Sequence, residues 1–153
     1  MTREKLYFRK WFDIKPMTKN KKILVVDDRR EVRFLISTAL RFSPFDVIET
    51  SCGEDALAIL EVTLPDLIFL DIVMPGKMDG LAVCRMIKGN IDWAIVPVVI
   101  MTTMGQATDR EEAFLAGADA YMVKPFSIEN LQQLIRQFLG EKDLSPYFSK
   151  EAL

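Results

Sequence analysis

The chain has 153 residues, of which 50% are hydrophobic and 27% are charged, and its formal net charge is -2. This composition is typical of one globular domain and excludes a chain that is disordered throughout. There is no histidine, and the two cysteines, Cys52 and Cys84, have no metal-type spacing. Imidazole catalysis, His-containing metal sites and a disulfide framework are therefore excluded.

The N-terminal residues differ in charge from the rest of the chain. Residues 1–22 contain eight Lys or Arg and two acidic residues. No apolar run approaches the ~18 residues of a membrane span, and no apolar signal core follows the basic residues. We therefore expect a cytoplasmic protein with three parts: a basic and aromatic arm (1–21), a domain (22–140) and a short tail (141–153) without an output domain.

The arm allows several interpretations. Tyr7, Trp11 and Ile14 share one face if the arm is helical, as in a segment that docks on a partner or on a membrane surface through residues 3–14. A terminal segment packed on its own domain and a disordered tail are the alternatives. Because no motif that reads bases follows the arm, we expect no direct binding of nucleic acid.

After the arm, strand and helix patterns alternate. In chain order they predict strand 22–28, helix 30–42, strand 45–50, helix 51–62, strand 65–71, helix 81–89, strand 96–103, helix 108–116, strand 120–124 and helix 128–140. Capping boxes predict helix starts at Ser51 and Thr108, and Ser127 is a predicted cap of the last helix. Five apolar strands with interleaved helices predict a parallel, doubly wound α/β sheet covered on both faces.

Polar residues follow the predicted strands where each one ends. They are Asp27 and Asp28, Asp71, Thr102 and Thr103, and Lys124. Each has an ordinary explanation on its own, because acids at strand ends also start turns or cap helices. Ligands bind beyond the carboxyl ends of such strands, and acidic oxygens suit Mg²⁺. Together these residues predict a site for Mg²⁺ (or Mn²⁺) at which a carboxylate accepts a phosphoryl group.

The motifs "VVDD", "LDIVMPGKMDG", "IMTT" and "YMVKPF" resemble those of the receiver domains of two-component response regulators, from about Lys22 to Gly140. The resemblance implies a flavodoxin-like, CheY-like fold with strand order 2-1-3-4-5. It also implies that Asp71 is the phosphoacceptor and that Asp27, Asp28, Asp71 and the backbone carbonyl of Val73 hold the metal. Thr102 would bind the phosphoryl group, Lys124 would pair with it before a cis bond to Pro125, and Tyr121 would be the aromatic switch.

The chain departs from the family pattern at three places. Lys77 is an added residue in the loop before Gly80, where it is a solvated lysine or contacts the phosphate. Val73 and Thr103 lie at positions that tune the rate of hydrolysis in the family. Because Val73 has no polar side chain to position water, we expect a long-lived phosphate on Asp71.

These observations predict a stand-alone response regulator that is not an enzyme on other substrates. It would accept its phosphoryl group from a histidine kinase or phosphotransfer protein and signal through a changed protein-binding face, as a monomer or a phosphorylation-linked dimer. The alternatives are a receiver-like module that acts without phosphorylation, a receiver from a longer regulator, and an aspartyl-phosphate phosphatase. A phosphatase would need an acid two residues after the nucleophile, where Val73 stands.

Overall fold

The computed structural model describes residues 19–103 and 107–140. The predicted arm (1–21) and tail (141–153) thus lie largely or wholly outside the described residues. The elements, in chain order, are β1 (Lys21–Val26), α2 (Arg30–Ala39), β2 (Phe45–Thr50), α3 (Gly53–Val62), β3 (Leu67–Asp71), α4 (Gly80–Gly89), β4 (Val98–Thr102), α5 (Ala107–Leu115), β5 (Ala120–Val123) and α6 (Ile128–Leu139).

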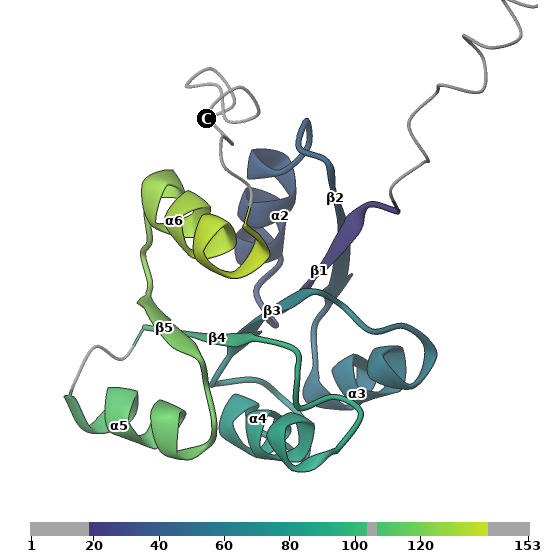
Figure 1. Cartoon of the computed structure of the whole chain (residues 1–153). Coiled ribbons are helices and arrows are strands. Elements are labelled where there is room, and N and C mark those ends of the chain that lie inside the picture. The colour runs from purple at the N-terminus through teal and green to yellow at the C-terminus, as the bar shows by residue number, and fades with distance from the viewer. Residues whose placement is uncertain (1–18, 104–106, 141–153) are drawn as a thin grey trace, which may run out of the picture.

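The strands form one parallel sheet in the order β2-β1-β3-β4-β5, as predicted (Figure 1). Helices α2 and α6 cover one face, and α3, α4 and α5 cover the other. The chain winds outward from β1 to β2 and then returns to place β3 on the other side of β1. The carboxyl ends of β1 and β3 therefore flank the point where the strand order reverses, which is where ligands bind in such sheets.

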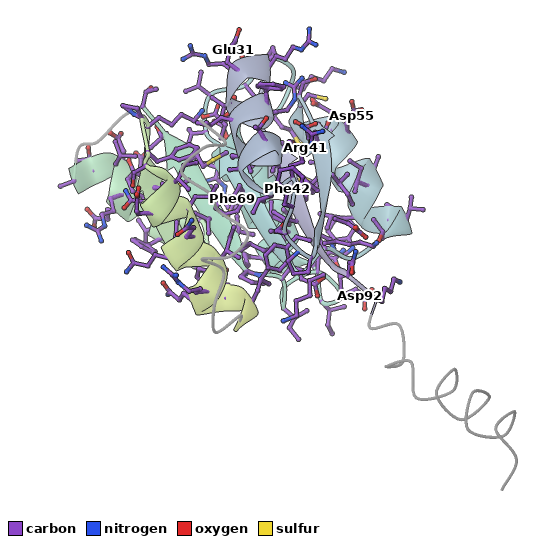
Figure 2. All side chains as sticks on the ribbon, turned by 90° about the horizontal axis from the view of Figure 1, so that it is seen from above. Glu31, Arg41, Phe42, Asp55, Phe69 and Asp92 are labelled. Carbon is purple, nitrogen blue, oxygen red and sulfur yellow. The ribbon has the colours of Figure 1, made fainter. Side chains whose placement is uncertain are left out.

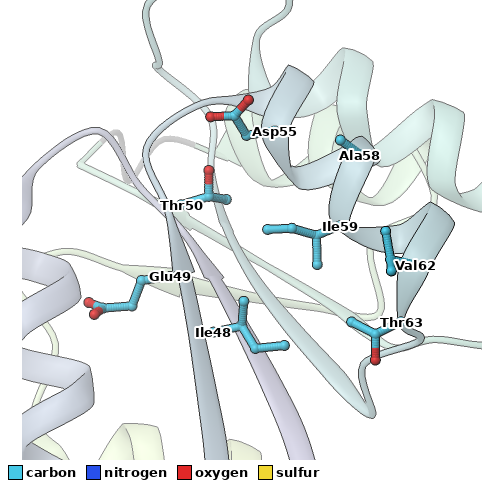
Figure 3. Close-up of a pocket in the computed structure, with 8 residues that line it drawn as sticks. All are labelled: Ile48, Glu49, Thr50, Asp55, Ala58, Ile59, Val62 and Thr63. Atoms are coloured by element: carbon cyan, nitrogen blue, oxygen red, sulfur yellow. The ribbon is translucent and has the colours of Figure 1, made fainter.

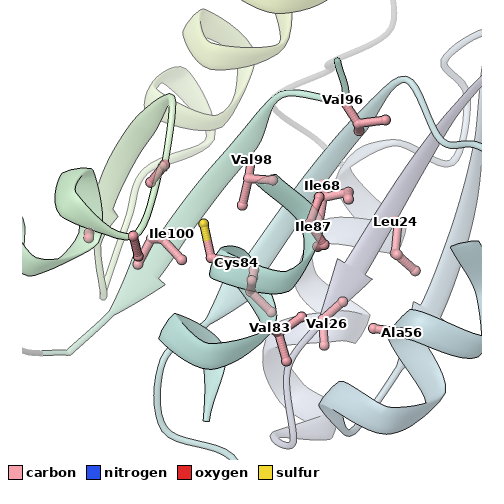
Figure 4. Close-up of a cluster of buried hydrophobic side chains, with 14 of the residues drawn as sticks. Leu24, Val26, Ala56, Ile68, Val83, Cys84, Ile87, Val96, Val98 and Ile100 are labelled. Carbon is pink, nitrogen blue, oxygen red and sulfur yellow. The ribbon is translucent and has the colours of Figure 1, made fainter. Parts of the chain in front are cut away.

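Alternate residues of the central strands pack into two separate cores. Leu24 and Val26 face the α3–α4–α5 layer, shown in Figure 4, whereas Ile23 and Val25 face the α2–α6 layer. Phe69 of β3 is fully buried in the second core, while the labelled Asp55 and Asp92 lie at the periphery of the molecule (Figure 2). Burying one side chain as large as that of Phe69 contributes about 1.5–3 kcal/mol to the stability of the fold. Because both cores contain such side chains, packing on both faces holds the central strands in place.

The predicted capping boxes are wrong, and the predicted cap at Ser127 is confirmed. The N-cap of α3 is Cys52, one residue after Ser51, and it makes no side-chain cap hydrogen bond. Helix α5 begins at Ala107, so Thr108 lies inside the helix. Ser127 Oγ accepts a hydrogen bond from the backbone N–H of Asn130 at 3.1 Å. Within the described ranges, no helix has the length and apolar character needed to cross a bilayer.

Candidate phosphoryl and metal site

Strand register brings the polar strand ends to one edge of the sheet. Val26 pairs with Leu70, so Asp27 and Asp71 are the next residues on neighbouring strands. Asp71 itself pairs with Met101, which precedes Thr102. Thr102 pairs with Val123, which precedes Lys124, and the Lys124 N–H donates to the Thr102 carbonyl at 2.8 Å. Four strands thus contribute to a single cluster.

Asp27, Asp28 and Asp71 form an acidic cluster in which one carboxylate oxygen of each lies within 4.8 Å of the others. Asp27 and Asp71 are buried, whereas Asp28 is exposed. The ammonium group of Lys124 forms an ion pair with Asp27 and lies 3.3 Å from Asp71 Oδ1. Three carboxylates facing one lysine leave a net negative site, which a divalent cation would neutralise.

The pKa of Asp71 is raised from its ordinary value of 3.8 to about 6. Burial is the main cause and the charge of Asp27 adds to it, while Lys124 acts in the opposite direction. The folded protein therefore holds a proton on Asp71 at pH values where the unfolded chain has lost it. The ionised carboxylate of Asp71 therefore lowers the stability of the metal-free protein, and a bound divalent cation would offset this effect.

This shift predicts that Asp71→Asn makes the metal-free protein more stable at pH 7. The stabilising contribution of the raised pKa is complete below about pH 4 and is lost as pH rises through about 6. The variant has no ionisable group at this position and avoids this loss. Because solvent partly screens the charges, we expect its free energy of unfolding at pH 7 to exceed that of the parent by about 2 kcal/mol. Urea unfolding of parent and variant in EDTA between pH 4 and 8 measures it. A gain that is equally large at pH 4 would contradict the electrostatic cause.

Contacts with backbone atoms fix the chain around Asp27 and around Asp71. Asp27 Oδ1 accepts from the N–H of Arg29 at 2.9 Å, and Arg33 Nη1 donates to the carbonyl of Asp27 at 2.8 Å. Gly80 packs directly on the end of β3, where an added Cβ would lie 1.9 Å from the carbonyl oxygen of Asp71. Neither Arg33 nor the close approach of Gly80 was predicted from the sequence, because both depend on tertiary contacts.

The loop after Asp71 is fixed at two points. Gly76 adopts a φ of 106°, and the N–H of Lys77 donates to Glu54 Oε1 of α3 at 3.0 Å. Further along, Asp79 caps α4 by accepting from the N–H of Ala82 at 2.8 Å. The backbone of Lys77 is therefore tied to α3, while its side chain is exposed.

The remaining predicted site residues lie on β5 or just beyond the ends of β3, β4 and β5. Val73 is 61% exposed just beyond β3, and Thr103 is exposed just beyond β4. Tyr121 of β5 is half-buried beside the α3–α4–α5 core, and burial raises its pKa. The peptide bond between Lys124 and Pro125 is cis.

Curated relatives of known sequence are similar along most of the chain. A probable transcriptional regulator ycf27 of Porphyra purpurea is 41% identical over 122 residues, which are 80% of this chain and 49% of the relative. The DNA-binding dual master transcriptional regulator RpaA of Synechocystis is 34% identical over 86% of this chain and 54% of the relative. The chain thus spans about half the length of these relatives.

The DNA-binding name does not match the expectation that this chain makes no contact with nucleic acid. That name describes the whole relative, of which this chain covers 54%. Binding of DNA by a protein that contains this chain is therefore compatible with the comparison, and the expectation for these 153 residues stays a prediction.

Solved structures share the fold. A putative response regulator from Chloroflexus aurantiacus superposes with a TM-score of 0.75 at 28% identity, over 80% of this chain and 100% of that one. The receiver domain of the sensor histidine kinase PA1611 from Pseudomonas aeruginosa, solved with a magnesium ion in its active site cleft, has a TM-score of 0.72 at 28% identity over 80% and 99%. The Mn²⁺-bound response regulator Rcp1 has a TM-score of 0.69 at 29% identity over 80% and 96%.

The sequence family of the response regulator receiver domain matches residues 23–136, which include every residue of the cluster. Sequence relatives, superposed structures and the arrangement of the strand ends agree with this match. The chain therefore belongs to the receiver domains of two-component response regulators.

Proposed function

We propose that Asp71 accepts a phosphoryl group from a histidine kinase or phosphotransfer protein. In this step a carboxylate oxygen of Asp71 forms a bond to phosphorus while the donor's bond to phosphorus breaks. Support comes from one observation above all: Asp71 lies at the end of β3 within reach of both Asp27 and the ammonium group of Lys124. Lys124 and Thr102 would interact with the phosphoryl oxygens, which carry the developing charge.

The cluster fits Mg²⁺ or Mn²⁺. Carboxylate oxygens are the ligands that these hard cations prefer, and Asp27, Asp28 and Asp71 would hold the ion together with the carbonyl of Val73. A bound divalent cation supplies positive charge that lowers the barrier to phosphoryl transfer. The similar structures that contain Mn²⁺ or Mg²⁺ support this proposal.

The output would be a changed protein-binding surface. Phosphate on Asp71 would draw Thr102 and Lys124 inward, and the ring of Tyr121 would follow into the space behind Thr102. The surface affected is formed by α5, β5 and α6. A downstream protein would read this surface, with the receiver as a monomer or a phosphorylation-linked dimer in the cytoplasm, and no enzyme activity on other substrates is needed.

The length of the relatives favours a second setting for the same chemistry. Because the chain spans about half of the similar transcriptional regulators, these residues would also serve as the receiver of a longer regulator. The phosphorylation step is the same in both settings, and only the element that reads the changed surface differs.

Incubation with acetyl phosphate and Mg²⁺ tests the proposed phosphoacceptor. We expect the intact mass of the parent to increase by one phosphoryl group and that of Asp71→Asn to stay unchanged. Asp92→Asn, at an exposed position away from the cluster, serves as the matched control and should be modified like the parent. No mass increase in the parent would favour a module that acts without phosphorylation, and steady phosphate release from small esters would favour a phosphatase.

Val73 provides a prediction about the lifetime of the phosphate. Its exposed apolar side chain lies two residues after Asp71 and offers no hydrogen bond to an attacking water. We expect Val73→Asn to shorten the lifetime of the Asp71 phosphate several-fold, which is less than the ~10²–10⁴-fold effect of general acid–base catalysis, because Asn orients a water without taking its proton. Decay of the phosphorylated mass in Mg²⁺ measures this, with Val73→Ala as control. An unchanged lifetime in the Asn variant would remove Val73 as a rate-tuning residue.

A further inference from the structure

A groove runs between the edge strand β2 and helix α3 on the side of the molecule away from α5 and α6 (Figures 1 and 3). Its volume is about 520 Å³. Its walls are largely apolar, with Ile48 on the strand and Ala58, Ile59 and Val62 on the helix. Val62 is 86% exposed and adds to the apolar surface that the groove presents to solvent.

The strand that forms one wall has an open backbone edge. Among the described residues, β2 pairs with β1 on one side and with no strand on the other. Soluble proteins usually cover or blunt such an edge, and an extended segment can do so by pairing with it. An apolar groove beside an open edge is suited to a segment of chain with large apolar side chains.

A second hollow connects the groove to the point where the arm joins the domain. It has a volume of about 460 Å³ and is lined by Lys19–Lys22 on one side and by Val62, Thr63, Leu64 and Asp66 on the other. Val62 and Thr63 line both hollows. The arm therefore joins the domain at one end of the groove.

Charge and apolar content also match between the arm and this surface. Strand β2 and helix α3 contain five acidic residues and no basic one. Residues 3–15 contain five Lys or Arg. The same stretch also contains six large apolar or aromatic residues, which are Leu6, Tyr7, Phe8, Trp11, Phe12 and Ile14. A basic segment with large apolar side chains complements an apolar groove with acidic surroundings.

The arm is also long enough to follow the groove. At ~3.3 Å per extended residue, Ile14 can lie ~16 Å and Leu6 ~43 Å from Lys19. Helix α3 has 10 residues, a length of ~15 Å at 1.5 Å per residue. Even a partly helical arm therefore reaches along the whole groove.

We propose that residues 6–14 of the arm dock in the groove between β2 and α3 of the same molecule. The apolar side chains cover Ile59 and Val62, and the Lys and Arg residues lie near the acids of β2 and α3. This contact does not depend on phosphorylation of Asp71, and it leaves the surface of α5, β5 and α6 open.

Fluorescence of Trp11 in the full chain tests the docking. The chain has two tryptophans, so Trp93→Phe leaves Trp11 as the sole reporter. In this background we expect the emission of a shielded indole. The double variant Ala58→Arg/Val62→Arg places two cations in the groove at exposed positions, and we expect its emission to shift to longer wavelength and its quenching by acrylamide to increase.

The control is Ile91→Arg/Ile95→Arg, which also replaces two exposed apolar residues with cations, outside the groove. It should leave Trp11 emission unchanged. The urea unfolding midpoints of both double variants should equal that of the Trp93→Phe protein, which shows that both remain folded. Emission typical of exposed indole in the Trp93→Phe protein overturns the proposal. So does shielding that appears only with anionic phospholipid vesicles, which assigns the arm to a membrane surface, or only at high protein concentration, which assigns it to the groove of a second copy.

Discussion

Replacing Gly80 with alanine is expected to lower the free energy of unfolding by about 3 kcal/mol, at the upper end of overpacking costs. The added Cβ would lie 1.9 Å from the carbonyl oxygen of Asp71 and 2.8 Å from Cα of Ile72. These are backbone atoms of the chain that carries the phosphoacceptor, so no side-chain rotation relieves the clash. The start of α4 must move away from β3, and urea unfolding at pH 7 measures the cost.

Gly89, at the other end of the same helix, is the matched control. A Cβ at Gly89 would meet no atom within 4 Å. Since alanine is a better helix former than glycine, we expect Gly89→Ala to be neutral or to stabilise by up to about 1 kcal/mol. Equal effects at the two glycines would show that helix propensity, and not contact with Asp71, determines the result.

Replacing Lys124 with methionine should have an effect of similar size. The substitution keeps the length of the side chain and removes the cation that Asp27 and Asp71 share. Breaking a buried ion pair leaves uncompensated charge and costs about 3 kcal/mol or more. We expect this loss at pH 7 in EDTA, with a further rise in the pKa of Asp71. Added Mg²⁺ should restore more stability to the variant than to the parent, because it replaces the missing charge.

Lys88 is the control for this substitution. Its ammonium group lies 2.7 Å from Asp119 and donates to the carbonyls of Ala94 and Val96, in contacts that do not involve the acidic cluster. Lys88→Met should also lose stability, and Mg²⁺ should not restore it. If Mg²⁺ had the same effect on both variants, Lys124 would not be the cation that balances the cluster.

The parallel sheet could be predicted because its signals are local and repeated. Each strand is a short apolar run, each is followed by a helical pattern, and this alternation permits few topologies. Helix starts were less predictable. Ser51 has the spacing of a capping box, yet Glu54 accepts from the backbone of Lys77, and α3 starts at Gly53, two residues after Ser51.

The site could be anticipated from residue type, but its supports could not. Asp27, Asp71 and Lys124 follow apolar runs, and parallel register then brings them together. Gly80 is a small residue in a loop motif until the backbone of Asp71 is placed beside it. Arg33 likewise belongs to a helix pattern, and only the folded loop shows that it donates to the carbonyl of Asp27. Contacts of this kind join distant segments and leave no periodic signal.

The two fixed points of the loop after β3 have a consequence for chain length. Lys77 is held by Glu54, and Gly80, directly after the cap Asp79, donates its N–H to the carbonyl of Ile72 at 2.7 Å. Met78, between these two points, packs against the α3–α4–α5 core. Closing a slightly longer flexible loop costs only a fraction of a kcal/mol, but an insertion at Met78 would displace these contacts. A short epitope tag or a fluorescent label should therefore disturb the site when it is inserted in this loop.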